Sequence, residues 1–406
     1  IATWGATLYY GMKSDQAVDI TEETSKIETT KPTTNRRNLP NAPRARQQTI
    51  HQQHLRLRVK HWICTRSTDG NWNVRIKHDP RSTSRPEGER VLRTHYRYQI
   101  QGPDAPKIFE KMNGGPVQDI KFFHVDWINV GSKKVQALRH GMSGAPGLEI
   151  WGPYDDKHYI NSTILEAAAE AGVDLVQCGS RAYSTNTLES GWIPSPLPGI
   201  YTGDGMMAEY RDWLGSDMYE AAGAIGGSFV SDNIEDYYVN PFELGYDFYI
   251  GWKKDDFVGK DALAAMKGSA GNRKKVTFEW NKEDVLKVIA SAFDEGVPYK
   301  WIDFPQPNYA SSSADMVMQG DKMVGMSMFN GYSYNERCVL SLGVVEQSVN
   351  VGDVLTLKWG EADETQKTSA EKHRQAEIRV RVSDTPYAKE VREGGYAADS
   401  WRAKAS

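Results

Sequence analysis

The chain has 406 residues, a formal net charge of -4 at pH 7 and a composition that is 39% hydrophobic. This length predicts two or three domains with ample core, and the charge lacks the basic excess that is typical of nucleic-acid binding. The three cysteines, Cys64, Cys178 and Cys338, lie far apart and in no metal-ligand spacing, and no apolar run approaches the roughly 20 residues that a membrane-spanning helix needs. We therefore expect a cytoplasmic protein without disulfides, metal or membrane span, whose partner is a small molecule or another protein.

The first 60 residues differ from the rest of the chain. Between Ile20 and Arg58 the sequence is rich in Thr, Gln, Arg, Lys and Pro and shows neither helical nor alternating periodicity. Such a segment buries little apolar surface, so we expect it to be extended or disordered. Its basic residues fit either a solvated tail or a contact with an acidic partner. Globular character resumes at Trp62.

Residues 96–172 predict a small α/β unit. We expect strands at 96–101, 120–130 and 135–140, a short helix that carries Ile108, Phe109 and Met112, and a second helix at 155–172. With one further strand, this is the strand, helix, strand, strand, helix, strand order of ferredoxin-like domains. The predicted fold class is α+β, with an antiparallel sheet that has helices on one face and leaves the other face free for a partner domain.

A glycine-rich loop separates the strand at 135–140 from an apolar run with one carboxylate, Glu149. Gly141, Gly144 and Gly147 permit a tight turn and a close approach of the backbone to a ligand. A carboxylate directly after such a loop suits a flat heterocycle with adjacent N–H donors, which it can hold through two hydrogen bonds. A β-hairpin with a surface glutamate explains the same residues, so both interpretations stand.

The remainder predicts a linker and an all-β segment. We expect a short helix at Met206–Leu214, a glycine-rich turn at Gly223–Gly227, and strands at 275–280, 316–318, 323–329, 339–345, 354–359 and 376–382. Turns are expected at Gly320-Asp321, Gly331 and Gly352-Asp353, and an exposed polar loop at 360–375. The methionines of this segment predict core packing rather than a cofactor site.

Four segments follow the order and spacing of one family's motifs: YQIQGPDA from Tyr98, HGMSGAPGLEI from His140, SRAYSTNTLESG from Ser180 and NPFELGYDFYIGWKKDDFVGKDAL from Asn240. They resemble the glycine-cleavage T-protein (aminomethyltransferase) superfamily, which binds tetrahydrofolate. The finer motifs RSTSRP, KFFH, GAPGLEIWGPY, GSRAY, NTLESGWIPSPLP and GSFVSDNIEDYYVNP are similar to those of the tetrahydrofolate-dependent aryl O-demethylases that act on vanillate and syringate.

This resemblance covers the chain from about residue 60 to its C-terminal end and implies a T-protein-like folate-binding fold. It implies a divergent N-terminal region at 1–60 that is poorly ordered or incomplete, a folate-binding α+β domain at 61–270, a β-barrel domain at 271–390 and a tail at 391–406.

The resemblance also implies roles for five residues. Cleaving an aryl methyl ether requires a proton at the departing oxygen, and a tyrosine, with an unperturbed pKa of roughly 10, matches the phenol that it protonates. Tyr183 of the GSRAY motif takes this role and counts among the folate contacts. Glu149 matches the carboxylate that pairs with the pterin amino and ring N–H groups. Gln99, Phe122 and Trp192 match positions that line the pterin and aminobenzoyl parts.

Three further features bear on the site and on the choice of reaction. Glu189 is either a further site carboxylate or one half of a buried pair with a cation such as Arg181. The loop reads Gly-Ala-Pro-Gly where T-proteins carry an acidic residue before the last glycine, which favours demethylation over aminomethyl transfer. Arg56 and Trp62 are separated by the same interval as the carboxylate-binding arginine of the demethylases and the tryptophan downstream of it, but the residues between them differ.

The resemblance thus implies an enzyme that moves a methyl group from a methoxylated aromatic acid of the vanillate or syringate type to tetrahydrofolate. Two alternatives remain open. A catalytically impaired folate-binding protein would keep Glu149 and the aromatic residues but lack a competent substrate pocket. An aminomethyltransferase or other one-carbon transferase would use an amine or sulfonium donor.

Overall fold

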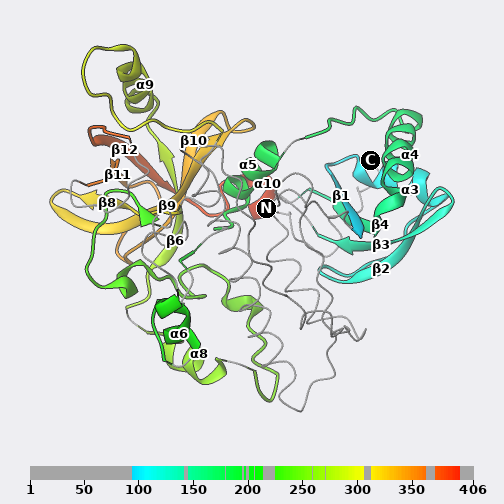
Figure 1. Cartoon of the computed structure of the whole chain (residues 1–406), viewed down its shortest axis with the longest axis horizontal. Helices are drawn as coiled ribbons and strands as arrows, with labels where there is room; N and C mark the ends of the chain where they lie inside the picture. The colour runs from blue at the N-terminus through cyan, green and yellow to red at the C-terminus, as the bar shows by residue number, and fades with distance from the viewer. Residues whose placement is uncertain are drawn as a thin grey trace, which may run out of the picture. The chain divides into compact units, whose positions relative to one another are not determined.

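The computed structural model describes two parts of the chain, an α/β unit and a β-barrel with its associated helices (Figure 1). The described residues are 94–140, 145–178, 180–193, 196–197, 201–204, 206–213, 225–257, 259–269, 271–305, 312–362 and 371–393. The N-terminal region expected at 1–60, together with Cys64, Arg56 and Trp62, lies outside these residues, so the expectations for it stay predictions. The expected division into domains also stays a prediction.

A four-stranded sheet with the order β1-β4-β3-β2 forms the α/β unit. Its strands are β1 (His95–Gln101), β2 (Val125–Val130), β3 (Lys133–Arg139) and β4 (Gly147–Pro153). Antiparallel registers join β2 to β3 and β3 to β4. At the two ends of β1, Gly102 N donates to Pro146 O (3.0 Å) and Tyr154 N donates to Thr94 O (2.9 Å), which runs β1 antiparallel to β4 as well. The expected antiparallel sheet is confirmed.

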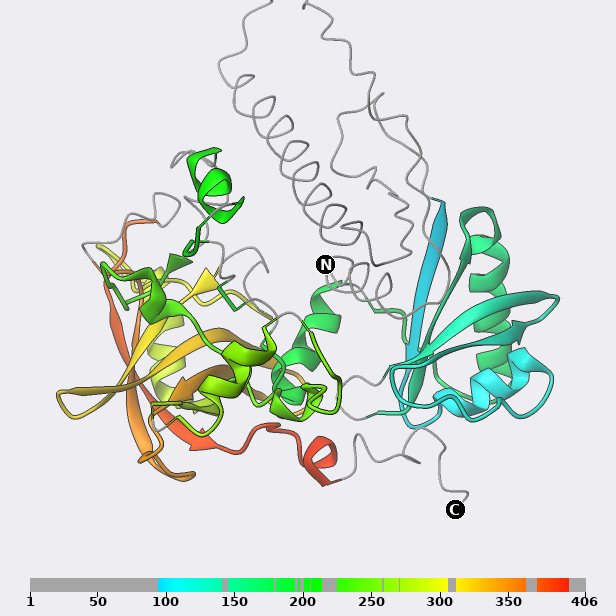
Figure 2. The same cartoon turned by 90° about the horizontal axis from the view of Figure 1, so that it is seen from below.

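Two helices cover one face of this sheet, α3 (Ala105–Asn113) and α4 (Lys157–Glu170) (Figure 2). The side chains of Ile108, Phe109 and Met112 are buried, as their helical spacing predicts. Gly114 ends α3 in the left-handed conformation (φ 73°), where a residue without Cβ has no steric penalty. The α+β class with helices on one face is therefore confirmed.

The order of elements differs from the prediction at one strand. The last strand was expected after the second helix, but β4 precedes α4, and residues 173–178 beyond α4 form no strand. The glycine loop turns the chain back into a hairpin, so that Leu148 and Ile150 are buried beside β1. The apolar run after α4 stays at the surface instead, and Val176 is 71% exposed.

The second part is a closed barrel with the strand order β10-β6-β12-β11-β8-β9. Its strands are β6 (Lys274–Trp280), β8 (Asp315–Gln319), β9 (Lys322–Ser333), β10 (Cys338–Val345), β11 (Val354–Trp359) and β12 (Ala376–Ser383). All six expected strands are confirmed. The turn expected at Gly331 is wrong, because Gly331 lies inside β9 opposite Leu340. Helix α9 (Lys282–Ala290) was not expected; Asn281 caps it by accepting a hydrogen bond from Asp284 N (3.1 Å).

Shorter elements complete the described structure. They are α5 (Ser180–Ser190), α6 (Met206–Trp213), α8 (Lys260–Met266), α10 (Lys389–Glu393), the paired strands β5 (Ile225–Gly226) and β7 (Ser312–Ser313), and the 3-10 helices η3 (Tyr154–Asp156), η4 (Ile234–Tyr237), η5 (Asp247–Tyr249) and η6 (Ser291–Phe293). The short helix expected near 206–214 is confirmed as α6. The loop expected to be exposed at 360–375 has a buried residue near its start, Glu361, whose carboxylate binds Lys300 Nζ (2.6 Å). In the described part of the chain, none of the helices has the length and apolar character needed to cross a membrane.

Candidate functional site

The face of the sheet opposite the helices carries a cluster of polar side chains. Side chains alternate between the faces of a strand, and Tyr96 and Ile100 of β1 are buried on the helix side. Arg97 and Gln99 therefore share the opposite face. The ion pair between Arg97 and Glu149 of β4 places the Glu149 carboxylate on the same face. The structure thus brings together two of the predicted site residues, Gln99 and Glu149.

Glu149 is the buried charge of this cluster, with only 8% of its surface exposed. Arg97 Nε forms an ion pair with its Oε1, and His140 Nδ1 lies 3.9 Å from its Oε2. Gly147 makes this arrangement possible, because a Cβ at that position would overlap Ile100 O of β1. The glycine of the loop therefore acts through close packing of β4 on β1. Gly141 and Gly144 lie outside the described residues.

Burial governs the protonation of the cluster. It raises the pKa of Glu149, while the adjacent Arg97 guanidinium acts in the opposite direction. Burial, and after it Arg97, lowers the pKa of His140 to about 4. At neutral pH His140 is thus uncharged, and Arg97 is the cation that balances the Glu149 carboxylate. The glutamate is not the exposed surface residue of the simpler hairpin interpretation.

Two glutamines connect the cluster to the end of the loop. Gln99 Nε2 donates to Gln101 Oε1 (2.9 Å) and lies 3.4 Å from His140 Nδ1. Gln101 Nε2 in turn donates to Ala145 O (2.9 Å), two residues before β4. These hydrogen bonds hold the Gln99 side chain beside His140, on the face of the sheet opposite the helices.

An aromatic row adjoins His140. The ring of Phe123 lies 5.2 Å from the imidazole, and the half-buried Phe122 lies 4.6 Å from Phe123, both in edge-to-face geometry. Phe123 adopts φ 57°, and its backbone N donates to Arg139 O (2.9 Å), which holds this turn against the end of β3. Phe122 is therefore placed next to the polar cluster, where a stacking role remains a prediction.

The lowered pKa of His140 makes stability depend on pH. An unfolded histidine takes up its proton near pH 6.5, whereas the folded His140 does so near pH 4. Between these values the unfolded chain binds more protons, so acidification disfavours the folded state. Relative to His140→Phe, we expect the free energy of unfolding of the wild type to fall by about 2 to 3 kcal/mol between pH 7 and pH 4. Urea unfolding at a series of pH values measures this.

The control for this experiment is His158→Phe on α4, whose histidine is exposed. This variant should keep the pH dependence of the wild type. If the curves of the wild type and of His140→Phe run parallel from pH 7 to pH 4, His140 is not the buried neutral histidine that the geometry indicates.

The other predicted site residues lie on or next to α5. Tyr183 belongs to this helix, but its side chain lies outside the described residues. Trp192 follows the helix, and 46% of its surface is exposed. No contact in the described part of the chain joins Trp192 to Glu149, so its role and that of Tyr183 stay predictions.

Glu189 of the same motif has a structural explanation. It is 2% exposed, and its carboxylate accepts hydrogen bonds from Ser333 Oγ (2.6 Å) and Asn335 Nδ2 (3.0 Å) of the β9–β10 hairpin. The side chain of Arg181, its proposed partner, lies outside the described residues. These bonds favour the structural interpretation of Glu189, with neutral partners rather than a cation among the residues described.

Sequence reasoning missed Arg97 and His140 as members of the cluster. A usable signal existed for Arg97, since it lies two residues before Gln99 in a predicted strand and so shares its face. His140 was counted as the last residue of a strand without any site role. A buried carboxylate needs a cation nearby, and this requirement would have pointed to Arg97.

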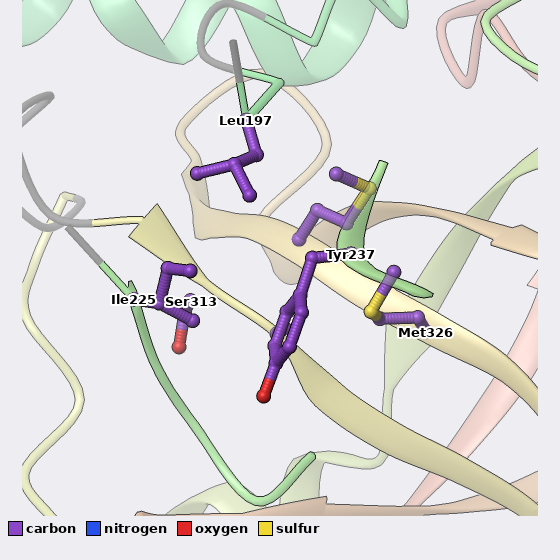
Figure 3. Close-up of a pocket in the computed structure, with 7 residues that line it drawn as sticks. Leu197, Ile225, Tyr237, Ser313 and Met326 are labelled. Atoms are coloured by element: carbon purple, nitrogen blue, oxygen red, sulfur yellow. The ribbon is translucent and has the colours of Figure 1, made fainter. Parts of the chain in front are cut away.

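A small cavity lies elsewhere, against the barrel (Figure 3). Its lining includes Leu197, Ile225, Tyr237, Ser313 and Met326, and its volume of about 20 Å³ suffices for one water molecule. Met326 is buried in a cluster with Tyr237, Ala314 and Val344. The expectation that the methionines pack the core is thus confirmed for Met326, and the cavity is too small for a folate.

Comparison with known proteins adds an independent line of evidence. Residues 61–195 match the family described as GCVT N-terminal domain. The chain is 39% identical over 345 residues to syringate O-demethylase of Sphingobium sp. (strain NBRC 103272 / SYK-6), which covers 84% of this chain and 72% of that protein. It is 28% identical over 317 residues to sesamin methylene transferase of Sinomonas sp. (strain No.22), covering 74% of this chain and 67% of that protein. It is also 29% identical over 181 residues to an aminomethyltransferase of Caldanaerobacter subterraneus subsp. tengcongensis, covering 44% of this chain and 38% of that protein.

Proposed function

The chain belongs to the glycine-cleavage T-protein superfamily, in the branch that includes syringate O-demethylase, and from this premise we propose that it transfers the methyl group of a methoxylated aromatic acid to tetrahydrofolate. The observation that carries the proposal is the buried Glu149 with its Arg97 counterion on the face of the sheet opposite the helices. In the motif that resembles the family's, this carboxylate matches the residue that we expect to bind the pterin.

The residues around Glu149 suit a pterin ring. Tetrahydrofolate, the cofactor of this family, supplies the amine nitrogen that accepts the methyl group. Glu149 Oε2 lies 3.9 Å from His140 Nδ1, which is longer than a hydrogen bond. A carboxylate oxygen has more than one acceptor position and is thus suited to accept from an N–H of the ring. Gln99 adds an amide that both donates and accepts, and Phe122 adds a flat apolar surface.

We expect Tyr183 to supply the proton to the ether oxygen. A phenolate is a poor leaving group, so the ether oxygen needs a proton as the methyl group departs. A tyrosine hydroxyl has an intrinsic acidity close to that of the product phenol, and proton transfer between them is nearly balanced. Helix α5 carries Tyr183 in the motif that resembles the demethylases, and Trp192 follows at the end of the same helix.

The substrate and its setting follow from the same reasoning. We propose an aromatic acid of the syringate or vanillate type, of the kind that lignin breakdown releases, since the relative with 39% identity is named for syringate. A reducing cytoplasm fits the two described cysteines, Cys178 and Cys338, which are free thiols.

The test is anaerobic incubation of the purified protein with tetrahydrofolate and a panel of methoxybenzoates, with 5-methyltetrahydrofolate and the demethylated phenol both measured by mass spectrometry. We expect equal amounts of the two products with at least one methoxybenzoate. Tetrahydrofolate binding without methyl transfer would instead identify a folate-binding protein that lacks the chemistry. Transfer only from amine or sulfonium donors would assign a different one-carbon reaction.

A further inference from the structure

The C-terminal end of α5 is fixed to the barrel from two sides. The Glu189 carboxylate binds Ser333 and Asn335, as described above, and its backbone O accepts from Ala388 N (3.3 Å). Gly191, with φ +68°, approaches Thr385 so closely that a Cβ would overlap the threonine Cγ2. The segment that leaves α5 therefore has a defined path across the barrel surface.

Lys275 holds the next residues of this path. It lies on β6, and its Nζ donates to Gly191 O (2.8 Å) while lying 4.8 Å from the centroid of the Tyr246 ring. The Tyr246 hydroxyl in turn accepts a hydrogen bond from Ile193 N (3.2 Å). The backbone is thus bound on both sides of Trp192, directly before it and directly after it.

Trp192 itself projects from this fixed segment. Its backbone N donates to Thr187 O (3.2 Å), which continues the turn at the end of the helix. Its side chain remains 46% exposed. A large aromatic side chain that is held at its backbone and open at its ring suits stacking against a flat ligand, because little side-chain freedom is lost on binding.

The charge of Lys275 calls for an explanation beyond packing. Burial lowers its pKa to about 8, and the ion pairs found among the described residues include none with Lys275. Removing an ammonium group from water without a carboxylate partner is unfavourable. The favourable contacts described for it are the Gly191 carbonyl and the Tyr246 ring. Both belong to the support of the Gly191–Ile193 segment.

We propose that Lys275, acting with Tyr246, is a positioning residue that fixes the Gly191–Ile193 segment and so presents the Trp192 ring to tetrahydrofolate. The inference rests on the proposed function, because it takes tetrahydrofolate as the ligand. Lys275 does not touch the reacting atoms, so it should affect cofactor binding more than the chemical step.

The test compares Lys275→Met with Lys274→Met. Methionine keeps an unbranched apolar chain but removes the donor and the charge. Lys274 is the preceding residue on β6, and its Nζ donates to Gln347 O (3.0 Å) rather than to Gly191 O. We expect Lys275→Met to raise both the Kd and the KM for tetrahydrofolate about fivefold, with kcat nearly unchanged. Lys274→Met should match the wild type, and Lys275→Arg should recover most of the affinity.

A double-mutant cycle with Trp192→Ala separates positioning from general stability. If Lys275 acts through Trp192, Lys275→Met should cause no further loss of tetrahydrofolate affinity in the Trp192→Ala background. An equal loss in both backgrounds, or an unchanged Kd together with a lowered Tm, would overturn the inference. Tyr246→Phe is the second variant if Lys275→Met does not fold; it removes the acceptor for Ile193 N and should raise the Kd in the same direction.

These outcomes are distinguishable from failure of the proposed function. Titration of the wild type with tetrahydrofolate tests that function alone, and absence of binding would refute the function and the inference together. Binding and methyl transfer by the wild type, with no effect of Lys275→Met, would leave the function intact and reject only the positioning role.

Discussion

Tyr183→Phe is expected to lower the rate of methyl transfer by about 10²- to 10⁴-fold, the range typical of losing a general acid, while tetrahydrofolate affinity stays nearly constant. Phenylalanine keeps the aromatic ring and removes only the hydroxyl. Without it the departing phenolate leaves unprotonated, and this raises the barrier of the chemical step but not the free energy of cofactor binding. Single-turnover rates at saturating tetrahydrofolate, together with a binding titration, measure the two quantities separately.

Tyr334→Phe is the matched control for this experiment. Tyr334 is an exposed residue in the β9–β10 turn, so loss of its hydroxyl should leave both the rate and the affinity at wild-type values. Unchanged turnover in Tyr183→Phe would assign the proton to another group. A parallel loss of rate and folate affinity would make Tyr183 a binding residue rather than the acid.

The barrel strands were predictable because each presents one face to the core. Strand β12 alternates strictly between buried and exposed residues from Ala376 to Val382, and this is the period-two pattern that identifies a half-buried strand. The short turns at Gly320 and Gly352, both with positive φ, marked the ends of strands equally well. Local sequence sufficed wherever local geometry and burial agreed.

The same reasoning failed where pairing partners decided the structure. Residue Gly331 carries a turn signal, yet it lies within the long strand β9, because Leu340 of β10 pairs with it across the hairpin. Likewise, the run after α4 is apolar enough for a strand, but β4 occupies the place beside β1. In both cases the pairing of strands outweighed a local preference.

The candidate site shows the same division. The glycine loop pointed to Glu149, and the resemblance to the family's motifs pointed to Gln99, so these two residues were within reach of sequence reasoning. The support of Trp192 was not, because Lys275 reaches Gly191 across 84 residues of sequence. No periodicity in β6 marks Lys275 as a functional residue, and only the folded barrel shows which of the two lysines reaches Gly191.

Glu149→Gln is expected to weaken tetrahydrofolate binding by about 1.5 to 3 kcal/mol, the usual worth of a hydrogen bond to a charged group, or roughly 10- to 150-fold in Kd. Glutamine has the same shape, and its carbonyl oxygen can still accept from Arg97, so the strand pairing should survive. Its NH₂ group, however, replaces Oε2 and turns a donor toward the N–H groups of the pterin. Calorimetric titration with tetrahydrofolate gives the Kd directly.

The protonation of Glu149 provides a second and independent readout of the same assignment. Arg97 opposes the rise in the pKa of Glu149 that burial causes, so Arg97→Met should let the carboxyl group take up a proton at a higher pH than in the wild type. When the solution is acidified, the tetrahydrofolate affinity of Arg97→Met should therefore begin to fall at a higher pH than the affinity of the wild type. Glu170→Gln, at an exposed glutamate of α4, should leave both the affinity and its pH dependence unchanged.

If Glu149→Gln binds tetrahydrofolate as tightly as the wild type, the buried pair of Arg97 and Glu149 serves only to hold β1 against β4, and the cofactor site must lie elsewhere.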